Sequence, residues 1–147
     1  MVAPDGELRR PRTEKSGRPS AGHCGAGGRP AFDNAKHGFT DNGNTGTLTL
    51  SGNSTFSNSG TGFDADTAGA RAGLTANLAV SDGRPASRGA DPASSGNSWD
   101  IGGTWNDASV MSTDTDAVTA PRGTDGSLPS APAFLVPRNG APLGARL

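Results

Sequence analysis

"AFDNAKHGFTDN" (residues 31–42) and "TFSNSGTGFDAD" (residues 55–66) share one spacing of Phe, Asn and Gly-Phe. A shift of 24 residues superposes them and continues beyond them, matching Phe32 with Phe56 and Val80, Asn34 with Asn58, Gly38-Phe39 with Gly62-Phe63, Leu50 with Leu74, and Asn53 with Asn77. A fixed period of this length is the signature of a solenoid. About two and a half units can be followed, from Ala31 to about Gly83.

The residue types within the repeat favour strands over helices. Glu is absent from it, and Gly, Asn, Ser and Thr dominate, whereas helical repeats need Ala, Leu, Glu and Lys. "TLTLSGN" (47–53) alternates Thr and Leu, which is a strand signal. At about 3.3 Å per residue the unit traces a loop roughly 80 Å around, which suits one coil of a parallel β-helix. We therefore expect an all-β solenoid of about two to three coils.

Stacking of coils assigns roles to the recurring positions. We expect three inward columns, formed by Phe32, Phe56 and Val80, by Phe39 and Phe63, and by Leu50 and Leu74. The recurring Asn residues suit turns, where Asn tolerates left-handed backbone and its amide can bond to the next coil. Gly38 and Gly62 suit turns or bulges that need a positive φ.

Composition divides the chain near residue 30. Residues 1–30 sum to a charge of +3 and residues 31–147 to −4, and all nine Asn lie after residue 30. The first segment has no apolar run, so it predicts neither a signal peptide nor a membrane helix. We interpret 1–30 as an unrelated, disordered leader. Cys24 has no cysteine partner, so it predicts no internal disulfide.

We expect little regular secondary structure in the segments after the repeat. Residues 83–96 are interpreted as an exit loop that closes the coil segment 31–96. Residues 97–147 form a tail whose five prolines exclude long helices and central strands. Its apolar anchors, Trp99, Trp105, Phe134 and Leu135, are expected to cover the side and the last coil of the solenoid. Stacking of exposed Trp on sugar rings is the alternative.

Coil and tail together resemble one protein family. "AFDNAKHGFTDNGNTGTLTLSGN" (31–53) is similar to a late coil of the bacterial secreted pectate lyases of polysaccharide lyase family nine. "NSWD" (97–100), "SVMSTD" (109–114), "PRGTDGSLP" (121–129), "FLVP" (134–137) and "GARL" (144–147) are similar to that family's C-terminal tail. The resemblance implies a right-handed parallel β-helix that is extracellular and cleaves polygalacturonate by calcium-dependent β-elimination. In such a reaction calcium is held by an Asp cluster and a Lys acts as general base.

The family's two catalytic signatures are absent from this sequence. The resemblance implies an Asp-Asp-Gly-Trp-Asp cluster and a Gly-Phe-Lys-Leu-Gly stretch, yet no Asp-Asp pair occurs and Gly-Phe is followed by Thr40 and by Asp64. We expect a C-terminal part of such an enzyme whose catalytic coils were lost by truncation, frameshift or a wrong start. No catalytic residue is assigned, and the chain is expected to be inactive.

Weaker site candidates remain near the repeat. Lys36, Thr40 and Asp64 are candidates for the substrate groove, and His37 beside them suits an exposed turn. Asp41, Asp64 and Asp66 are weak calcium candidates, because hard oxygen ligands on adjacent coils can converge.

Partners and alternatives follow from the same reasoning. The partner implied by the resemblance is an acidic polysaccharide. We expect the chain to be monomeric and to bind neither nucleic acid nor a membrane. A non-catalytic polysaccharide-binding or structural β-helix module is the second hypothesis, and a product with no stable fold is the third.

Overall fold

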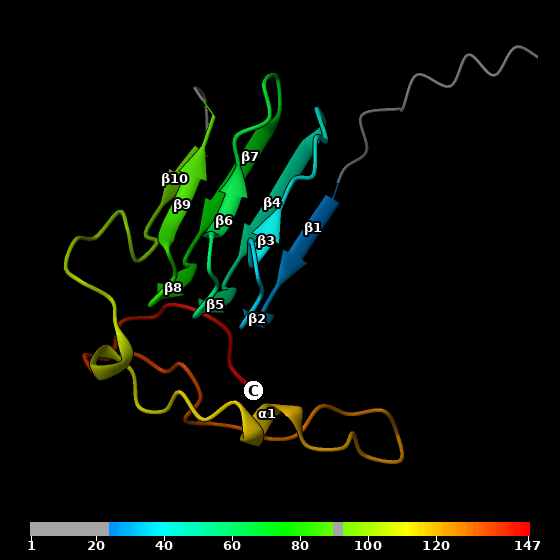
Figure 1. Ribbon diagram of the computed structural model, residues 1–147, viewed down its shortest axis with the longest axis vertical. Helices are drawn as coiled ribbons and strands as arrows, with labels where there is room; N and C mark the ends of the chain where they lie inside the picture. Colours follow the sequence, from blue (N-terminus) through cyan, green and yellow to red (C-terminus); the bar gives the residue numbers. More distant parts are fainter. Residues whose placement is uncertain (1–23, 90–92) are drawn as a thin grey trace, which may run out of the picture.

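The strands of the described residues belong to three parallel sheets (Figure 1). The computed structural model describes residues 24–89 and 93–147. Sheet order is β1-β4-β7-β10, β2-β5-β8 and β3-β6-β9, so successive strands along the chain belong to different sheets. The strands are β1 (Cys24–Gly27), β2 (Pro30–Phe32), β3 (Phe39–Thr40), β4 (Thr47–Ser51), β5 (Ser54–Phe56), β6 (Thr61–Ala65), β7 (Arg71–Thr75), β8 (Leu78–Val80), β9 (Arg84–Arg88) and β10 (Ala93–Ser95). This is a parallel β-helix, as predicted.

The register of the sheets reproduces the sequence period. Leu50 pairs with Leu74, Phe56 with Val80 and Phe39 with Phe63, each 24 residues apart. The spacing then shortens, since Phe63 pairs with Ala86 and Leu74 with Ser94. Coil number and handedness stay predictions.

The first strand lies inside the segment interpreted as the leader. Cys24↔Leu48 and Ala26↔Leu50 are parallel pairs of β1 with β4, so residues 24–30 belong to the coil segment. The boundary at residue 30 is thus corrected, because these residues extend the same ladder despite their different composition. The predicted disorder of residues 1–23 lies outside the described residues.

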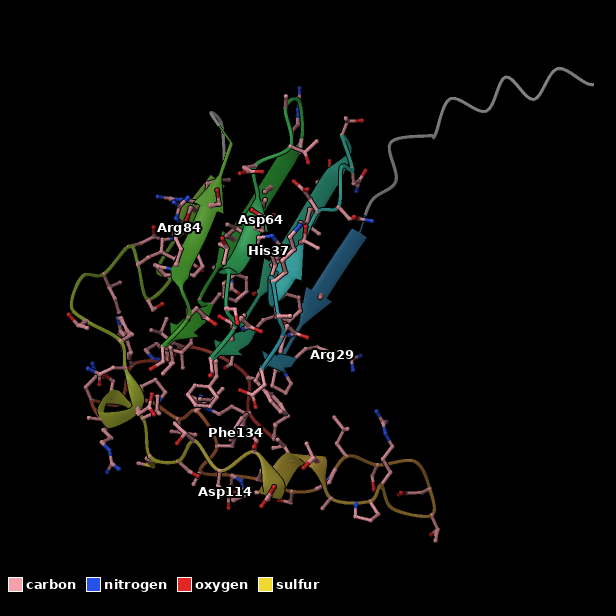
Figure 2. All side chains as sticks on the ribbon, viewed as in Figure 1. Arg29, His37, Asp64, Arg84, Asp114 and Phe134 are labelled. Atoms are coloured by element: carbon pink, nitrogen blue, oxygen red, sulfur yellow. The ribbon has the colours of Figure 1, made fainter. Side chains whose placement is uncertain are left out.

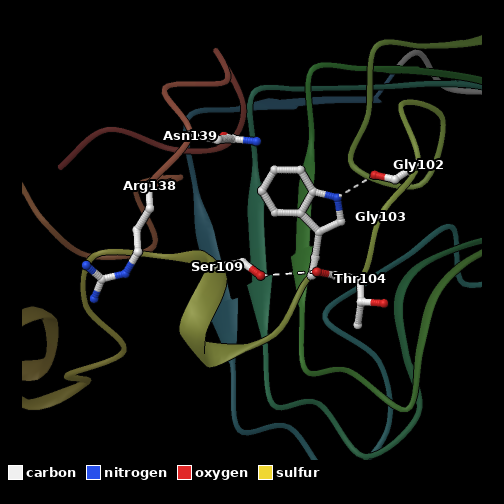
Figure 3. A pocket seen from close by; sticks show the side chains of 7 residues that line it. Gly102, Gly103, Thr104, Ser109, Arg138 and Asn139 are labelled. Atoms are coloured by element: carbon white, nitrogen blue, oxygen red, sulfur yellow. Dashed lines mark hydrogen bonds between the residues drawn. The ribbon is translucent and has the colours of Figure 1, made fainter.

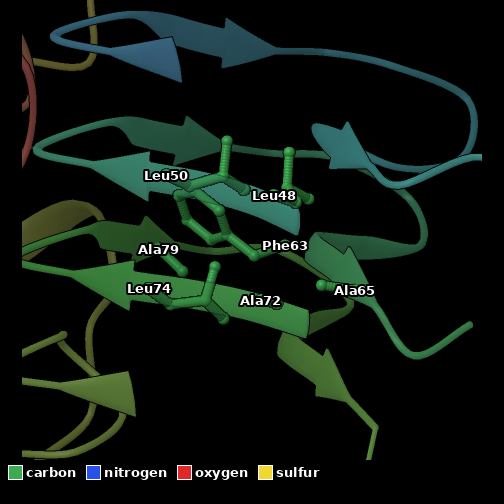
Figure 4. Close-up of a cluster of buried hydrophobic side chains, with 7 residues drawn as sticks. All are labelled: Leu48, Leu50, Phe63, Ala65, Ala72, Leu74 and Ala79. Carbon is green, nitrogen blue, oxygen red and sulfur yellow. The ribbon is translucent and has the colours of Figure 1, made fainter. Parts of the chain in front are cut away.

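Two of the three expected columns are inside the coils. Leu50 and Leu74 are buried in the same cluster as Phe63 (Figure 4). The rings of Phe39 and Phe63 stack with centroids 5.4 Å apart. Trp99 lies on the far side of Phe63, at a centroid distance of 5.2 Å, where Ala86 is too small to continue the aromatic column. Trp99 therefore covers the end of the core, as predicted.

The prediction that the column of Phe32, Phe56 and Val80 points inward is wrong, because these side chains point outward. These residues belong to a second apolar cluster that contains tail residues such as Phe134 and Leu135, whereas Ala79 belongs to the interior cluster. Phe32 meets Phe134 edge-on at 5.6 Å. Side chains alternate across a strand, so sheet β2-β5-β8 has Ala79 on its inner face and large apolar side chains on its outer face, which the tail covers.

The tail crosses the outer face of this sheet in extended form (Figure 1). Its regular elements are a 3₁₀ turn, η1 (Asp107–Ser109), and one helical turn, α1 (Asp116–Thr119). Near its end, the backbone N–H of Ala145 donates to Ser54 Oγ and that of Gly144 donates to the Ala76 carbonyl. Gly144 has φ +78°, and a Cβ there would collide with Ser54.

Two ladders of polar side chains hold the turns between coils. Asn53, Asn77 and Asn97 form the inner ladder, all fully buried, and each Oδ1 accepts from the backbone N–H of the preceding ladder position. Asn34, Asn58 and Asp82 form the outer ladder with the same pattern. Both ladders confirm that the amides bond to the next coil.

The backbone at these turns differs from the prediction. The left-handed residue is the one before each ladder position, for example Gly52 (φ 61°) and Ala76 (φ 53°), and not the Asn itself. Gly38 and Gly62 likewise lack a positive φ. A Cβ on Gly38 would lie 2.6 Å from Thr55 Cγ2 and 2.7 Å from the Gly62 carbonyl oxygen, so Gly38 is required by space.

Candidate functional site

The outward face of sheet β3-β6-β9 gathers the residues singled out in the sequence. Phe39 and Phe63 point inward, so their neighbours Thr40 and Asp64 point outward and pair in adjacent strands. Ser87 of β9 continues this row beside Asp64. Ser87 does not match Asp64 at the 24-residue period, because the spacing at β9 is one residue shorter.

An open cavity of about 410 Å³ lies along this face. It is lined by Lys36, His37, Thr40, Asp41, Asn42, Gly43, Asp64, Asp66 and Thr67. All three groove candidates and all three calcium candidates are therefore brought together, although they come from two adjacent coils. Asn42, Gly43 and Thr67 are turn residues that carried no signal of their own in the sequence.

His37 is held over Asp64 by a backbone contact (Figure 2). Its Nδ1 accepts from the Thr61 N–H at 3.2 Å, which places the proton of the neutral ring on Nε2. Nε2 lies 3.6 Å from Asp64 Oδ2, and both side chains are about one quarter to one fifth exposed (26% and 19%). The ring is therefore fixed in orientation and faces the carboxylate.

Lys36 is the cationic side chain of this cavity. It is exposed, and it makes no ion pair within residues 24–89 and 93–147. Its carbonyl accepts from Gly60 N–H at 2.6 Å, so the backbone rather than the side chain anchors it. The ammonium is thus able to reach an anionic ligand in the cavity.

Each of the three carboxylates contacts other groups of the protein. Asp41 Oδ1 accepts from Thr67 Oγ1 at 2.6 Å and from Gly43 N–H, and Oδ2 accepts from Thr67 N–H at 3.0 Å. Asp66 Oδ2 accepts from Ser87 Oγ, and Asp64 faces His37. Among the described residues, no group of three or more His, Cys, Asp or Glu side chains is placed to hold a metal ion. Calcium binding stays a prediction, and no chemical step here is assigned to it.

Asp82 has a structural role at the turn after β8. Asp82 ends the outer ladder, where its carboxylate accepts from Asn58 N–H at 2.9 Å, Asn58 Nδ2 at 2.7 Å and Thr55 Oγ1 at 2.6 Å. Burial raises the pKa of Asp82 above its ordinary value of 3.8, against the opposing effect of these hydrogen bonds.

In the described part of the chain no helix is long and apolar enough to cross a membrane.

Comparison with known proteins agrees with the resemblance noted in the sequence. Over 117 residues the chain is 43% identical to "Pectate lyase PEL9" of Emericella nidulans. The match covers 78% of this chain but 28% of PEL9, so the chain spans less than a third of that relative. No family model and no solved structure matches the chain. The bacterial assignment stays a prediction, because the match does not bear on it.

Proposed function

We propose that this chain is a region of an extracellular pectate lyase-like protein and that its β3-β6-β9 face contacts an acidic polysaccharide. The identity to PEL9 carries the proposal. The geometry supports it, because a row of outward polar groups lies along a parallel sheet, where an extended sugar chain has room to run across the strands. Lys36 is the side chain proposed to meet a uronate carboxylate.

We further propose that the chain alone binds this polysaccharide without cleaving it. β-Elimination needs a base at the carbon that loses its proton. In the repeat, the position after Gly-Phe that the resemblance reserves for the base Lys is occupied by Thr40 and Asp64. A hydroxyl cannot serve as that base at neutral pH, and Asp64 is already engaged with His37.

Two measurements on the same sample test both parts. Binding of trigalacturonate is measured by calorimetry, and release of unsaturated uronate from polygalacturonate, with calcium present, is measured by ultraviolet absorbance. We expect binding without turnover. Sustained product release would refute the absence of catalysis, and absence of binding would refute the assigned partner.

The role of the sheet face is tested by one matched pair of variants. Lys36→Gln removes the cation and leaves a polar, somewhat shorter side chain, so we expect trigalacturonate to bind several-fold more weakly. Arg71→Gln, on the exposed face of sheet β1-β4-β7-β10, is the control and should leave the affinity unchanged. Equal affinity of the Lys36 variant and the unmodified chain would contradict the placement.

A further inference from the structure

A second cavity lies in the tail, where the carbonyl of its lining residue Trp105 accepts from Ser81 N–H just after β8. It measures about 260 Å³ and is lined by Gly102, Gly103, Thr104, Trp105, Ser109, Arg138 and Asn139 (Figure 3). Pockets that bury drug-sized ligands measure about 300–1,000 Å³, so this cavity has room for one sugar ring rather than for an oligosaccharide.

Trp105 forms a wall of the cavity in a defined orientation. Its Nε1 donates to the Gly102 carbonyl at 3.3 Å, which ties the indole to the chain just before it (Figure 3). Gly102 and Gly103 have φ values of 80° and 90°, a backbone that side-chain-bearing residues rarely adopt. Two glycines in succession place no side chain beside the ring, which is half-buried and presents an apolar surface to the cavity.

Polar groups on the opposite wall have unused hydrogen-bonding capacity. Arg138 is held beside η1 by its backbone N–H, which donates to the Ser109 carbonyl at 3.0 Å. Its guanidinium has five N–H donors, and within the described residues one of its nitrogens donates, to the Met111 carbonyl at 3.4 Å. Arg138 forms no ion pair with a described carboxylate. A planar guanidinium with free donors matches the geometry of a carboxylate.

A neighbouring cavity shows why this one suits an anion. The neighbour, of about 400 Å³, shares Gly103, Thr104 and Trp105 with it but contains the Asp82 carboxylate and no cationic residue in its lining. The smaller cavity has Arg138 as its charged lining residue. Trp105 therefore separates a site that repels a carboxylate from one that attracts it.

We propose that the cavity between Trp105 and Arg138 is a binding subsite for one uronate residue of an acidic oligosaccharide. The apolar face of the sugar ring packs on the indole, and the carboxylate pairs with the guanidinium. The Asn139 amide, whose Oδ1 accepts from Ala141 N–H at 3.0 Å, keeps its Nδ2 for a sugar hydroxyl. The choice of an acidic sugar rests on the proposed function, whereas the position of the subsite rests on this geometry alone.

The experiment measures trigalacturonate binding to the full chain by calorimetry, with the fully methyl-esterified trimer as the neutral probe. Arg138→Gln should weaken trigalacturonate binding about tenfold or more, because one hydrogen-bonded charge pair is lost. Binding of the neutral trimer should not respond to this variant. Arg122→Gln, an exposed Arg of the same tail, is the control and should bind as the unmodified chain does. Trp105→Ala should weaken the binding of both probes, and far-ultraviolet circular dichroism verifies that each variant is folded.

The outcomes separate this subsite from the sheet face. If Lys36→Gln weakens binding and Arg138→Gln does not, the subsite is wrong and the proposed function stands. If Arg138→Gln alone weakens binding, the subsite stands and contact through the sheet face is wrong. If the unmodified chain binds neither probe, both proposals are refuted.

Discussion

The inner ladder predicts a large stability loss for Asn77→Ala. Asn77 is fully buried, and its side chain makes four hydrogen bonds, to Asn53 N–H (2.9 Å), Asn53 Nδ2 (3.2 Å), the Leu50 carbonyl (2.8 Å) and Asn97 Oδ1 (2.9 Å). Truncation leaves the buried Asn53 N–H without its acceptor.

The size of the stability loss depends on which hydrogen bonds the former partners of Asn77 keep. An orphaned buried N–H costs about 1–3 kcal/mol, and each further lost hydrogen bond about 0.5–1.5 kcal/mol. Asn53 Nδ2 keeps the Ala26 carbonyl and Asn97 Oδ1 keeps the Asn77 N–H, so their losses fall at the low end. We therefore expect about 3–4 kcal/mol, a large part of the 5–15 kcal/mol that is typical of folded domains.

Urea denaturation followed by circular dichroism measures this difference. Asn139→Ala is the control, because Asn139 is exposed and makes one local bond to Ala141 N–H, and it should cost less than about 1 kcal/mol. If Asn77→Ala costs no more than this control, the ladder is not what stabilises the stacked turns.

Asn77→Asp separates the two halves of the amide. The carboxylate still accepts from Asn53, but it faces the Leu50 carbonyl and Asn97 Oδ1, to which the amide donated. We expect this variant to be unstable at neutral pH and to recover partly on acidification, as the protonated acid regains one donor. A variant as stable as the unmodified chain at neutral pH would argue against this donor pattern.

Three further predictions concern the outer ladder, the coil interior and the tail. Asp82→Asn should raise the free energy of unfolding at neutral pH and lose this advantage in acid. The reason is that burial raises the pKa of Asp82 in the folded state. Its contribution to the free energy of unfolding is therefore most favourable below the pKa of the unfolded state and is lost as pH rises through the pKa of the folded state. Denaturation at several pH values checks this, and a stability difference between the variant and the unmodified chain that does not change with pH would contradict it. Gly38→Ala should cost about 2 kcal/mol through overpacking, while Gly25→Ala, whose Cβ would lie 3.7 Å from the Thr49 carbonyl, should be close to neutral; thermal melts of the two should therefore differ. Phe134→Ala should lower the free energy of unfolding by about 3–5 kcal/mol, because it exposes the outer face of sheet β2-β5-β8. Leu128 is already 45% exposed, so Leu128→Ala is the control and should cost under about 1 kcal/mol. Equal urea midpoints of the two variants would refute the covering role of the tail.

The candidate site was only partly predictable from the sequence. Thr40 and Asp64 were found because each follows a repeated Gly-Phe, and β alternation turns them outward once Phe39 and Phe63 are inside. Ser87 was missed because the spacing at β9 is one residue shorter than the repeat. The cavity of Trp105 and Arg138 had no signal at all, because 32 residues of irregular tail separate the two side chains.

The sequence by itself determined the class of fold and the register of strands β2 to β8. A period of 24 with alternating strand residues has few physical solutions, because each side chain must pack on its own counterpart in the next coil. The tertiary structure decided which face of each strand is inside. Phe32, Phe56 and Val80 recur as regularly as Leu50 and Leu74, and periodicity is identical for an inward column and for an outward column that another segment covers. Only the tail folding back on sheet β2-β5-β8 made the first column an outer one, since burial against a distant segment leaves no mark on local spacing.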